Sequence, residues 1–262
     1  MLPGAIIGDI AGSRFEHNNY RSIHFDIFDA GCHITDDTVC TVAVTEWIAA
    51  GGKDDLAAIM QRWCQKYPDA GYGGIFYEWI QATKPKSCNS FGNGSAMRVS
   101  PVAWLFDALE ATLKYAEQSA AITHNHPEGI KGAQAIAAAI WWARNGKNKA
   151  YIKKQIENCF ACALNDTCYH IRQHHESGAT CAATVPLAII AFLESEDFAH
   201  AIRLAVSPGG DSDTIAAMAG SIAEAFYGIP PEMENAALPY LPAEMIAVLR
   251  RIPTTRILRH TP

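Results

Sequence analysis

Helical periodicity runs through nearly every long segment of this chain, and it limits the possible folds more than any other feature of the sequence. Several segments are rich in alanine, such as residues 132–140, and this composition favours helices that pack closely against one another. The only alternating pattern typical of a strand lies at Ile23–Phe28. Helices are predicted at Leu2–Arg14, Asp37–Ala50, Asp54–Lys66, Gly74–Gln81, Ala96–Ala103, Leu109–Thr123, Glu128–Arg144, Tyr151–Ala163, Gly178–Glu194, Asp197–Val206, Asp213–Tyr227 and Ala243–Arg250.

The breaks between these segments contain glycine, proline and asparagine, as at Gly51-Gly52 and Pro230-Pro231. No linker, low-complexity run or internal repeat divides the sequence. A length of 262 residues is enough to bury one large core. We therefore predict an all-α fold, a compact multi-helix orthogonal bundle that forms a single domain over residues 1–262.

Charge and hydropathy exclude several classes of protein. The formal net charge is −6, which argues against a surface that follows nucleic-acid phosphates. No stretch approaches the roughly 18 consecutive apolar residues of a membrane span, and Met1–Gly12 lacks the basic start of a signal peptide. We expect a soluble, cytoplasmic protein without a membrane partner, and a monomer as the simplest state.

Eight cysteines are scattered along the chain, and reduced thiols are the expected state when export signals are absent. One group, Cys159, Cys162 and Cys168 with the histidines that follow, could be drawn as a zinc site. Residues 157–164 read as helix, however, and no second Cys-x-x-Cys pair matches the first. Reduced cysteines are therefore preferred over zinc.

Two acidic clusters lie far apart in the sequence, Thr35-Asp36-Asp37-Thr38 and Asp211-Ser212-Asp213-Thr214. Each runs into an apolar segment of small residues, so helix capping is one explanation for its composition. A cap needs only one such side chain, whereas each cluster has four polar residues in a row. Oxygen ligands at this density suit hard divalent cations such as Mg²⁺, Mn²⁺ or Ca²⁺. Gly209-Gly210 permit a tight turn that lets the second cluster point to one centre, and we favour metal binding over capping alone.

Glycines at positions 4, 8 and 12 fall on one face of the first predicted helix, where they allow another helix to approach closely. Close packing explains them better than phosphate binding does. Glu16 follows the end of this helix, where a carboxylate opposes the helix dipole unless a cation compensates it. From the residues alone, Glu16 is equally well a metal ligand or an acid with no such role.

Two loops carry candidate substrate-binding groups. Ser90–Arg98 is a small-residue loop that leads into a helix, and its amides could hold phosphate oxygens, although Gly-Asn-Gly is also a common turn. It lacks the Gly-Lys-Ser/Thr ending of a Walker A loop. His124 lies between two predicted helices and is either a catalytic or substrate-binding group or a loop histidine that caps a helix end.

These motifs occur in the order found in the ADP-ribosylglycohydrolases, and the chain resembles that family over roughly residues 3–228. The family includes the dinitrogenase reductase-activating glycohydrolase and the ADP-ribosylarginine and ADP-ribosylserine hydrolases. The resemblance implies a compact, wholly helical fold with a binuclear Mg²⁺ (or Mn²⁺) centre in a cleft. The matching stretches are Gly8-Asp9-Ile-Ala-Gly12 with Glu16, Thr35–Thr38, Gly92–Gly94 with Met97-Arg98, Thr123-His124 and Gly209–Thr214.

The resemblance also implies roles for individual residues. The implied metal ligands, with Glu16 near or on the centre, are Thr35, Asp36, Asp37, Asp211, Asp213 and Thr214. The implied substrate-binding residues are Gly73, Gly74, Ser90, Phe91, Gly92, Asn93, Gly94 and His124. No ligand is missing, which favours a working enzyme over the crystallin-related members that lose ligands. The segment between Glu16 and Thr35 is short, so the flap on the leaving-group side is reduced and the identity of the substrate stays open.

The implied reaction is hydrolysis of the glycosidic bond between ADP-ribose and a modified protein or other target, which releases free ADP-ribose. Arginine is the first choice of linkage on family frequency alone. Two metal ions would orient the ribose hydroxyls and lower the pKa of a water, with Glu16 or Asp37 as the base and Asp211 as a further catalytic residue. The alternatives are serine- or nucleobase-linked ADP-ribose, a phosphoester such as a dinucleotide, and a non-catalytic ADP-ribose-binding protein.

Overall fold

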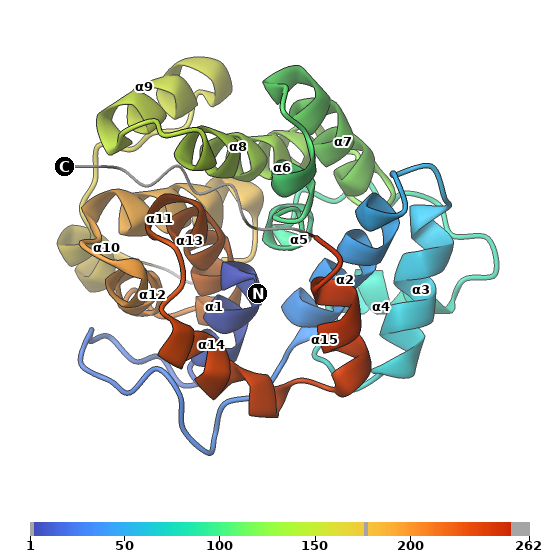
Figure 1. The fold of residues 1–262 in the computed structure, drawn as a ribbon, viewed down its shortest axis with the longest axis horizontal. Coiled ribbons are helices and arrows are strands. Elements are labelled where there is room, and N and C mark those ends of the chain that lie inside the picture. Colours follow the sequence, from blue (N-terminus) through green and yellow to red (C-terminus); the bar gives the residue numbers. More distant parts are fainter. Residues whose placement is uncertain (1–2, 176–177, 253–262) are drawn as a thin grey trace.

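The computed structural model describes residues 3–175 and 178–252, and apart from one bridge between Gly92 and Thr180 the regular structure in these ranges is helical (Figure 1). The all-α prediction is therefore confirmed, and no helix in the described ranges is long and apolar enough to cross a membrane. The α-helices are α1 (Gly4–Ser13), α2 (Asp36–Ala49), α3 (Leu56–Lys66), α4 (Gly74–Gln81), α5 (Gly94–Met97), α6 (Val102–Leu105), α7 (Leu109–Ala121), α8 (Pro127–Arg144), α9 (Lys149–Phe160), α10 (Cys168–His174), α11 (Cys181–Glu194), α12 (Phe198–Val206), α13 (Ser212–Tyr227), α14 (Pro231–Ala237) and α15 (Ala243–Leu249), with a 3-10 turn η1 (Leu238–Tyr240).

Several predicted boundaries are wrong. The segment Ala96–Ala103 is not one helix, because Pro101 has no amide hydrogen to donate and separates α5 from α6. The predicted helix Tyr151–Ala163 ends at Phe160, since Ala161 is left-handed with φ 49°. Ile23–Phe28 forms no strand in the described structure. Of the first predicted helix, Leu2 lies outside the described residues.

Short polar side chains start many of these helices. Thr35, Asp55, Asn148, Thr180 and Asp197 each accept a hydrogen bond from a backbone amide in the first turn of the helix that follows. Such caps satisfy amides that have no partner within the helix. For Thr35 the capping interpretation is therefore correct, and it holds alongside the other contacts of this cluster described below.

The glycine face of α1 lies against α13, as its spacing predicts (Figure 1). A Cβ added to Gly8 would lie 2.1 Å from the carbonyl oxygen of Ala216, and one added to Gly4 would lie 2.3 Å from that of Gly220. At Gly12 it would meet the Cα of Asp213 at 2.5 Å. Only glycine lets the two backbones come this close. This contact brings the end of α1, and with it Glu16, next to the second acidic cluster.

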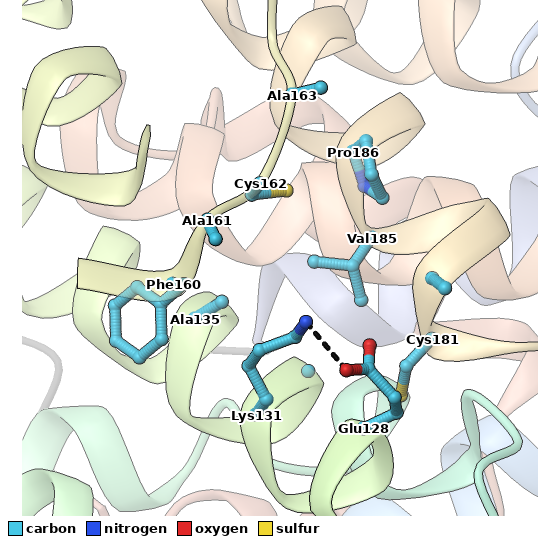
Figure 2. Close-up of a pocket in the computed structure, with 12 residues that line it drawn as sticks. Glu128, Lys131, Ala135, Phe160, Ala161, Cys162, Ala163, Cys181, Val185 and Pro186 are labelled. Atoms are coloured by element: carbon cyan, nitrogen blue, oxygen red, sulfur yellow. Dashed lines mark hydrogen bonds and ion pairs between the residues drawn. The ribbon is translucent and has the colours of Figure 1, made fainter. Parts of the chain in front are cut away.

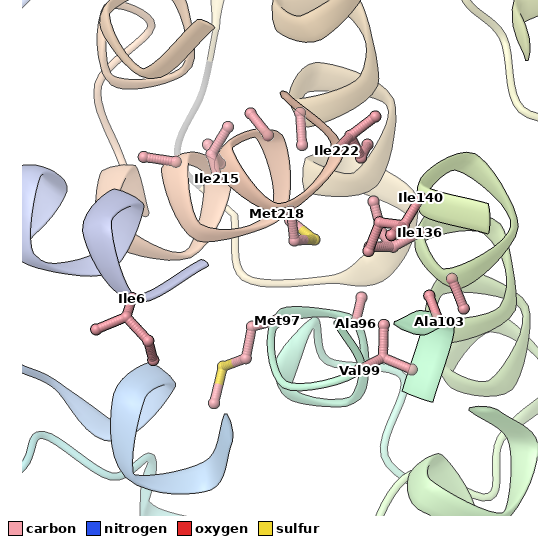
Figure 3. Packing of buried hydrophobic residues seen from close by; sticks show 14 of the residues in the cluster. Ile6, Ala96, Met97, Val99, Ala103, Ile136, Ile140, Ile215, Met218 and Ile222 are labelled. Atoms are coloured by element: carbon pink, nitrogen blue, oxygen red, sulfur yellow. The ribbon is translucent and has the colours of Figure 1, made fainter. Parts of the chain in front are cut away.

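The core is continuous around α13, which is buried along nearly its whole length. Figure 3 shows Met218 on the face of α13 that is turned toward α5, with Met97 and Ala96 opposite and Ile136 of α8 at the side. Alanine and glycine make up much of α13, so neighbouring helices approach it from several directions. A helix that is apolar all round is expected in the middle of a bundle.

Candidate active site

Asp9 holds the first acidic cluster in place. It lies in the middle of α1, is fully buried, and accepts hydrogen bonds at Oδ1 from the Thr35 hydroxyl (2.7 Å) and at Oδ2 from the amides of Thr35 and Thr38 (3.1 Å each). The Thr38 hydroxyl also donates to Oδ2. Burial raises the pKa of Asp9, and these four donors oppose the rise. The start of α2 is thus tied to α1, which itself lies on α13.

The second cluster reaches the first through a turn made of two glycines. Gly209 and Gly210 both have φ +75°, a conformation that favours glycine. After this turn, Thr214 Oγ1 donates to Asp37 Oδ2 at 3.0 Å. Asp211 Oδ2 accepts from the side-chain nitrogen Nδ2 of Asn93 at 2.5 Å. The two acidic stretches therefore meet, as predicted, and the loop before α5 meets them too.

Carboxylates crowd at this meeting point. One oxygen each from Glu16, Asp211 and Asp213 lie within 4.8 Å of one another. Burial raises the pKa of Glu16 and Asp213, and neighbouring carboxylates add to the rise. The pKa values of Asp36 and Asp37 lie well above the usual range for the same reason, with burial as the largest cause. Buried carboxylates this close to one another repel. The group is therefore stable only when some of its members are protonated or when cations are bound.

A cleft of about 350 Å³ opens above these acids. It brings together residues from the acidic clusters, the Ser90–Gly94 loop, the start of α4 and the end of α7. The predicted site residues that line it are Glu16, Asp36, Gly73, Gly74, Ser90, Gly92, Asn93, Gly94, His124, Asp211 and Thr214.

The other predicted site residues do not line this cleft. Thr35, Asp37 and Asp213 are buried behind the residues that do. Phe91 is 53% exposed, and its ring meets the edge of His126 with 5.5 Å between ring centroids. Asp37 and Asp213 are thus buried next to residues that line the cleft, whereas Phe91 stands at the surface beside the loop.

A smaller hollow of about 300 Å³ adjoins the cleft and shares Glu16, Ala179 and Asp211 with it. Asn19, Gly178 and Gly210 complete its wall, and Asn19 Oδ1 accepts from the Gly210 backbone amide at 2.5 Å. Of the described residues that line this hollow, two are carboxylates and none is basic.

Three residues in or near the site were not assigned a role from the sequence: Asp9, Asn19 and Arg98. The sequence did indicate a role for Asp9, because an acid within the apolar segment Gly4–Ser13 must find buried hydrogen-bond donors. Arg98 is 1% exposed and lines the cleft. Asn19 sits in an irregular segment without periodicity, so nothing in the sequence marks its contact with Gly210.

Another hollow lies between α8, α11 and residues 160–163, and it is largely apolar (Figure 2). Its two charged side chains are already paired, with Lys131 Nζ and Glu128 Oε1 2.7 Å apart. Cys162 and Cys181 also line it. It lacks both the glycine loop and the acids of the larger cleft, so the cleft is the better candidate for chemistry on a charged substrate.

The structure shows which histidine caps α8 and that the cysteines are free, whereas the role of His124 in catalysis or substrate binding stays a prediction. His126, not His124, caps α8, and its Nδ1 accepts from the Glu128 amide at 3.1 Å. All eight cysteines are free thiols. Among the described residues, the group of acids at Glu16, Asp211 and Asp213 is where metal-ligating atoms gather, and no cysteine belongs to it.

Comparison with known proteins agrees with this geometry. The family model described as ADP-ribosylglycohydrolase matches residues 1–257. The chain is 25% identical to the human (Homo sapiens) protein named ADP-ribosylhydrolase ARH3, over 89% of this chain and 86% of that protein. It is 28% identical to the ADP-ribosyl-[dinitrogen reductase] glycohydrolase of Rhodospirillum rubrum, over 75% and 69%.

One further relative and one solved structure are also similar to this chain. The chain is 25% identical to the ADP-ribosylarginine hydrolase Tri1 of Pseudomonas putida (strain GB-1), over 88% of this chain and 71% of that protein. A solved structure titled ADP-ribosylglycohydrolase-related protein complex superposes with a TM-score of 0.70, at 23% identity, over 95% of this chain and 94% of that one. The fold is therefore shared as well. The chain belongs to the ADP-ribosylglycohydrolase family, whose members hydrolyse glycosidic bonds of ADP-ribose.

Proposed function

We propose that this protein is a Mg²⁺-dependent hydrolase that cleaves the glycosidic bond between ADP-ribose and a modified arginine, releasing free ADP-ribose. The observation that carries the proposal is the meeting of the two acidic clusters at the floor of the cleft, beside a glycine loop. Family membership supports the class of reaction, and the finer points rest on the arguments below.

The residues present fit a divalent cation. Asp37 Oδ1 is buried and has no hydrogen-bond partner among the described residues, and every ligand atom in the set is an oxygen, as hard cations prefer. The residues that would hold two Mg²⁺ ions (or Mn²⁺), with Glu16 beside them, are Thr35, Asp36, Asp37, Asp211, Asp213 and Thr214. When bound, Mg²⁺ supplies Lewis acidity, which orients the ribose hydroxyls and makes a water more acidic.

Thr35 is the most constrained of these ligands. Its hydroxyl donates to Asp9 at 2.7 Å and accepts from the Asp37 amide at 3.3 Å. One lone pair of the oxygen is left for a cation. The role of Thr35 in metal binding therefore depends on Asp9, which sets the direction of the hydroxyl.

The diphosphate of the substrate fits the loop Ser90–Gly94. Its glycines allow close approach of a ligand, and His124 lies against Gly92 and Gly94. Gly73 and Gly74 also line the cleft, and no atom of the described residues lies within 4 Å of a Cβ added to either, so this side is open to a ligand. We place Phe91 against the adenine side of the substrate, because its exposed ring offers a surface for stacking.

Glu16 is the better candidate for the general base, and Asp37 the weaker one. Glu16 lines the cleft and its pKa is raised by burial, whereas Asp37 is buried below and holds Thr214. A base must come within hydrogen-bond reach of the attacking water, and only a group that lines the cleft can do so. Asp211, which also lines the cleft, stabilises the positive charge that develops on the ribose.

The smaller hollow next to the cleft favours a modified arginine as the leaving group. Glu16 and Asp211 border it, and none of the described residues that line it is basic. A guanidinium group, which carries positive charge and several donors, suits such a wall better than a serine hydroxyl does. The name of the Pseudomonas relative, an ADP-ribosylarginine hydrolase, supports the same choice.

The test is to incubate the protein and Mg²⁺ with arginine-, serine- and base-linked ADP-ribose and to measure free ADP-ribose. We expect release from the arginine linkage. Asp36→Ala and Asp211→Ala should remain folded and lose turnover by at least about a hundredfold, as expected for metal ligands. Release that persists in excess chelator would contradict the role of the metal, and tight ADP-ribose binding without release from any substrate would indicate a binding protein.

A further inference from the structure

Three buried side chains, linked by hydrogen bonds, lead from the protein interior to the cleft. Arg98 follows α5, and Thr123 and His124 follow α7; their exposed fractions are 1%, 1% and 6%. Arg98 Nη2 donates to Thr123 Oγ1 at 2.8 Å and to the Ser119 carbonyl oxygen at 3.1 Å. Thr123 Oγ1 and His124 Nδ1 are 2.6 Å apart.

The donor and acceptor roles of these three side chains follow from Arg98, whose own role is fixed. A guanidinium group has only donors, so the Thr123 oxygen must accept from Arg98. The hydroxyl hydrogen of Thr123 then needs an acceptor, and His124 Nδ1 lies at hydrogen-bond distance. If Nδ1 carried a proton instead, the second lone pair of the Thr123 oxygen could accept it, but the buried hydrogen of the Thr123 hydroxyl would then have no acceptor among the described residues. Nδ1 therefore accepts, and a neutral ring carries its proton on Nε2.

Nε2 of His124 lies next to the glycine loop, together with the neighbouring ring carbon Cε1. A Cβ added to Gly94 would lie 3.2 Å from Nε2, and one added to Gly92 would lie 3.4 Å from it. His124 lines the cleft together with these glycines. A proton on Nε2 therefore lies close to the part of the cleft where the substrate's diphosphate is expected.

The charge of the ring agrees with this arrangement. Burial, and after it the positive charge of Arg98, lower the pKa of His124 to about 3. His124 is therefore neutral at physiological pH, and it offers the cleft one defined donor rather than a cation.

We propose that Arg98, acting through the Thr123 hydroxyl, locks His124 in the Nε2–H tautomer, so that His124 donates a hydrogen bond to a phosphate or ribose oxygen of the bound substrate. Arg98 and Thr123 are positioning residues in this device. Its value lies in preorganisation, since a ring free to exchange tautomers presents an acceptor to the anion part of the time. The substrate half of this inference rests on the proposed function, whereas the tautomer itself does not.

The tautomer is measured directly by two-bond ¹H–¹⁵N NMR on ligand-free protein labelled with ¹⁵N-histidine. We expect His124 to have a protonated Nε2 and an unprotonated Nδ1, with no titration between pH 5 and pH 8. A proton on Nδ1 in the wild-type protein overturns the proposal. This reading needs no turnover, so it separates failure of this inference from failure of the proposed activity.

Variants then test the positioning residues, with ADP-ribose affinity measured by calorimetry in Mg²⁺. Thr123→Val removes the hydroxyl at nearly constant shape and should give mixed tautomers and about tenfold weaker binding. Thr123→Ser keeps the hydroxyl and should restore both properties. Arg98→Met should also give mixed tautomers, because the Thr123 hydroxyl is then free to turn. Unchanged tautomer and affinity in Thr123→Val and Arg98→Met would overturn the proposal.

A double-mutant cycle separates positioning from general damage. If Thr123 acts through His124, then Thr123→Val should weaken ADP-ribose binding no further once His124→Ala is present. A purely structural role would give the same loss in both backgrounds, and this result would count against the proposal. Absence of any ADP-ribose binding in the wild-type protein would contradict the substrate half and leave the tautomer to be decided by NMR.

Discussion

Thr214 Oγ1 donates a 3.0 Å hydrogen bond to Asp37 Oδ2 across 177 positions of sequence. The bond joins the two acidic clusters side chain to side chain. The other oxygen of this carboxylate, Asp37 Oδ1, is buried and has no hydrogen-bond partner in the part of the chain that the structure describes. The protein therefore satisfies only half of the carboxylate, and a buried, half-satisfied acid needs a proton or a cation.

The contact between α1 and α13 should not tolerate a side chain at its closest point. A Cβ at Gly8 would lie 2.1 Å from the carbonyl oxygen of Ala216, and backbone atoms cannot move aside as a side chain can. Gly8→Ala should therefore lower the free energy of unfolding by about 3 kcal/mol, measured by urea titration. Gly73→Ala, where a Cβ meets no atom within 4 Å, should change it by no more than about 0.5 kcal/mol. Equal midpoints for the two variants would refute the packing argument.

Asp9 should matter for stability and for activity together. Asp9→Asn replaces one acceptor oxygen by an NH₂ group that faces the donors of Thr35 or Thr38. We expect a loss of about 2–4 kcal/mol in unfolding free energy, and lower turnover in the protein that remains folded. Asp26→Asn makes the same chemical change at an exposed side chain and should leave both properties as they are. Full activity of Asp9→Asn would show that the first cluster does not depend on this anchor.

Long helices with a clear pattern could be predicted from the sequence because local composition decides them. The second cluster begins a helix predicted at Asp213–Tyr227 and found at Ser212–Tyr227, since small apolar residues fill its length. The glycine spacing of α1 also predicted a close helix partner. By contrast, α10 (Cys168–His174) is short and polar, and it depends on a cap at Thr167 and on burial of Ile171. Tertiary contacts of that kind leave no period in the sequence.

The acidic residues of the site were predictable from the sequence. Which of them line the cleft and which are buried was not. The acids were recognisable as a group because such density of oxygen donors has few uses. Which of them line the cleft depends on how α1 and α2 meet, and this contact runs through Asp9 over 26 positions of sequence. Single-residue patterns carry no information about such a pair. The same holds for Arg98, whose partners Ser119 and Thr123 come from the end of α7.

Binding of Mg²⁺ should stabilise the folded protein through the acidic centre. A ligand present at about one hundred times its Kd adds about 2.7 kcal/mol to the unfolding free energy. We expect this order of effect for the wild-type protein in urea titrations with and without Mg²⁺, and little or none for Asp36→Ala. Glu117→Ala, which removes an exposed acid on α7, should keep the full response. If Asp36→Ala responds as strongly as Glu117→Ala, the ions bind elsewhere.

Glu224 should make stability depend on pH independently of the metal centre. It is fully buried in α13, accepts a hydrogen bond from the Gly4 amide at 2.7 Å, and burial raises its pKa to about 8. Its proton is therefore held more tightly in the folded protein than in the unfolded chain. The stabilising contribution of the protonated form is complete below pH 4.5, the ordinary value for the side chain, and is lost as pH rises toward 8.

Glu224→Gln keeps an acceptor for the Gly4 amide and removes the ionisation. The variant should match the wild-type protein in unfolding free energy near pH 5 and exceed it by about 3 kcal/mol at pH 8. Urea titrations at both pH values, in saturating Mg²⁺, measure this difference while the acidic centre is held constant. A constant difference between the two proteins across this range would mean that Glu224 does not titrate there. A wild-type protein that is the more stable at pH 8 would mean that the ionised carboxylate strengthens the start of α1, as its place at a helix N-terminus also allows.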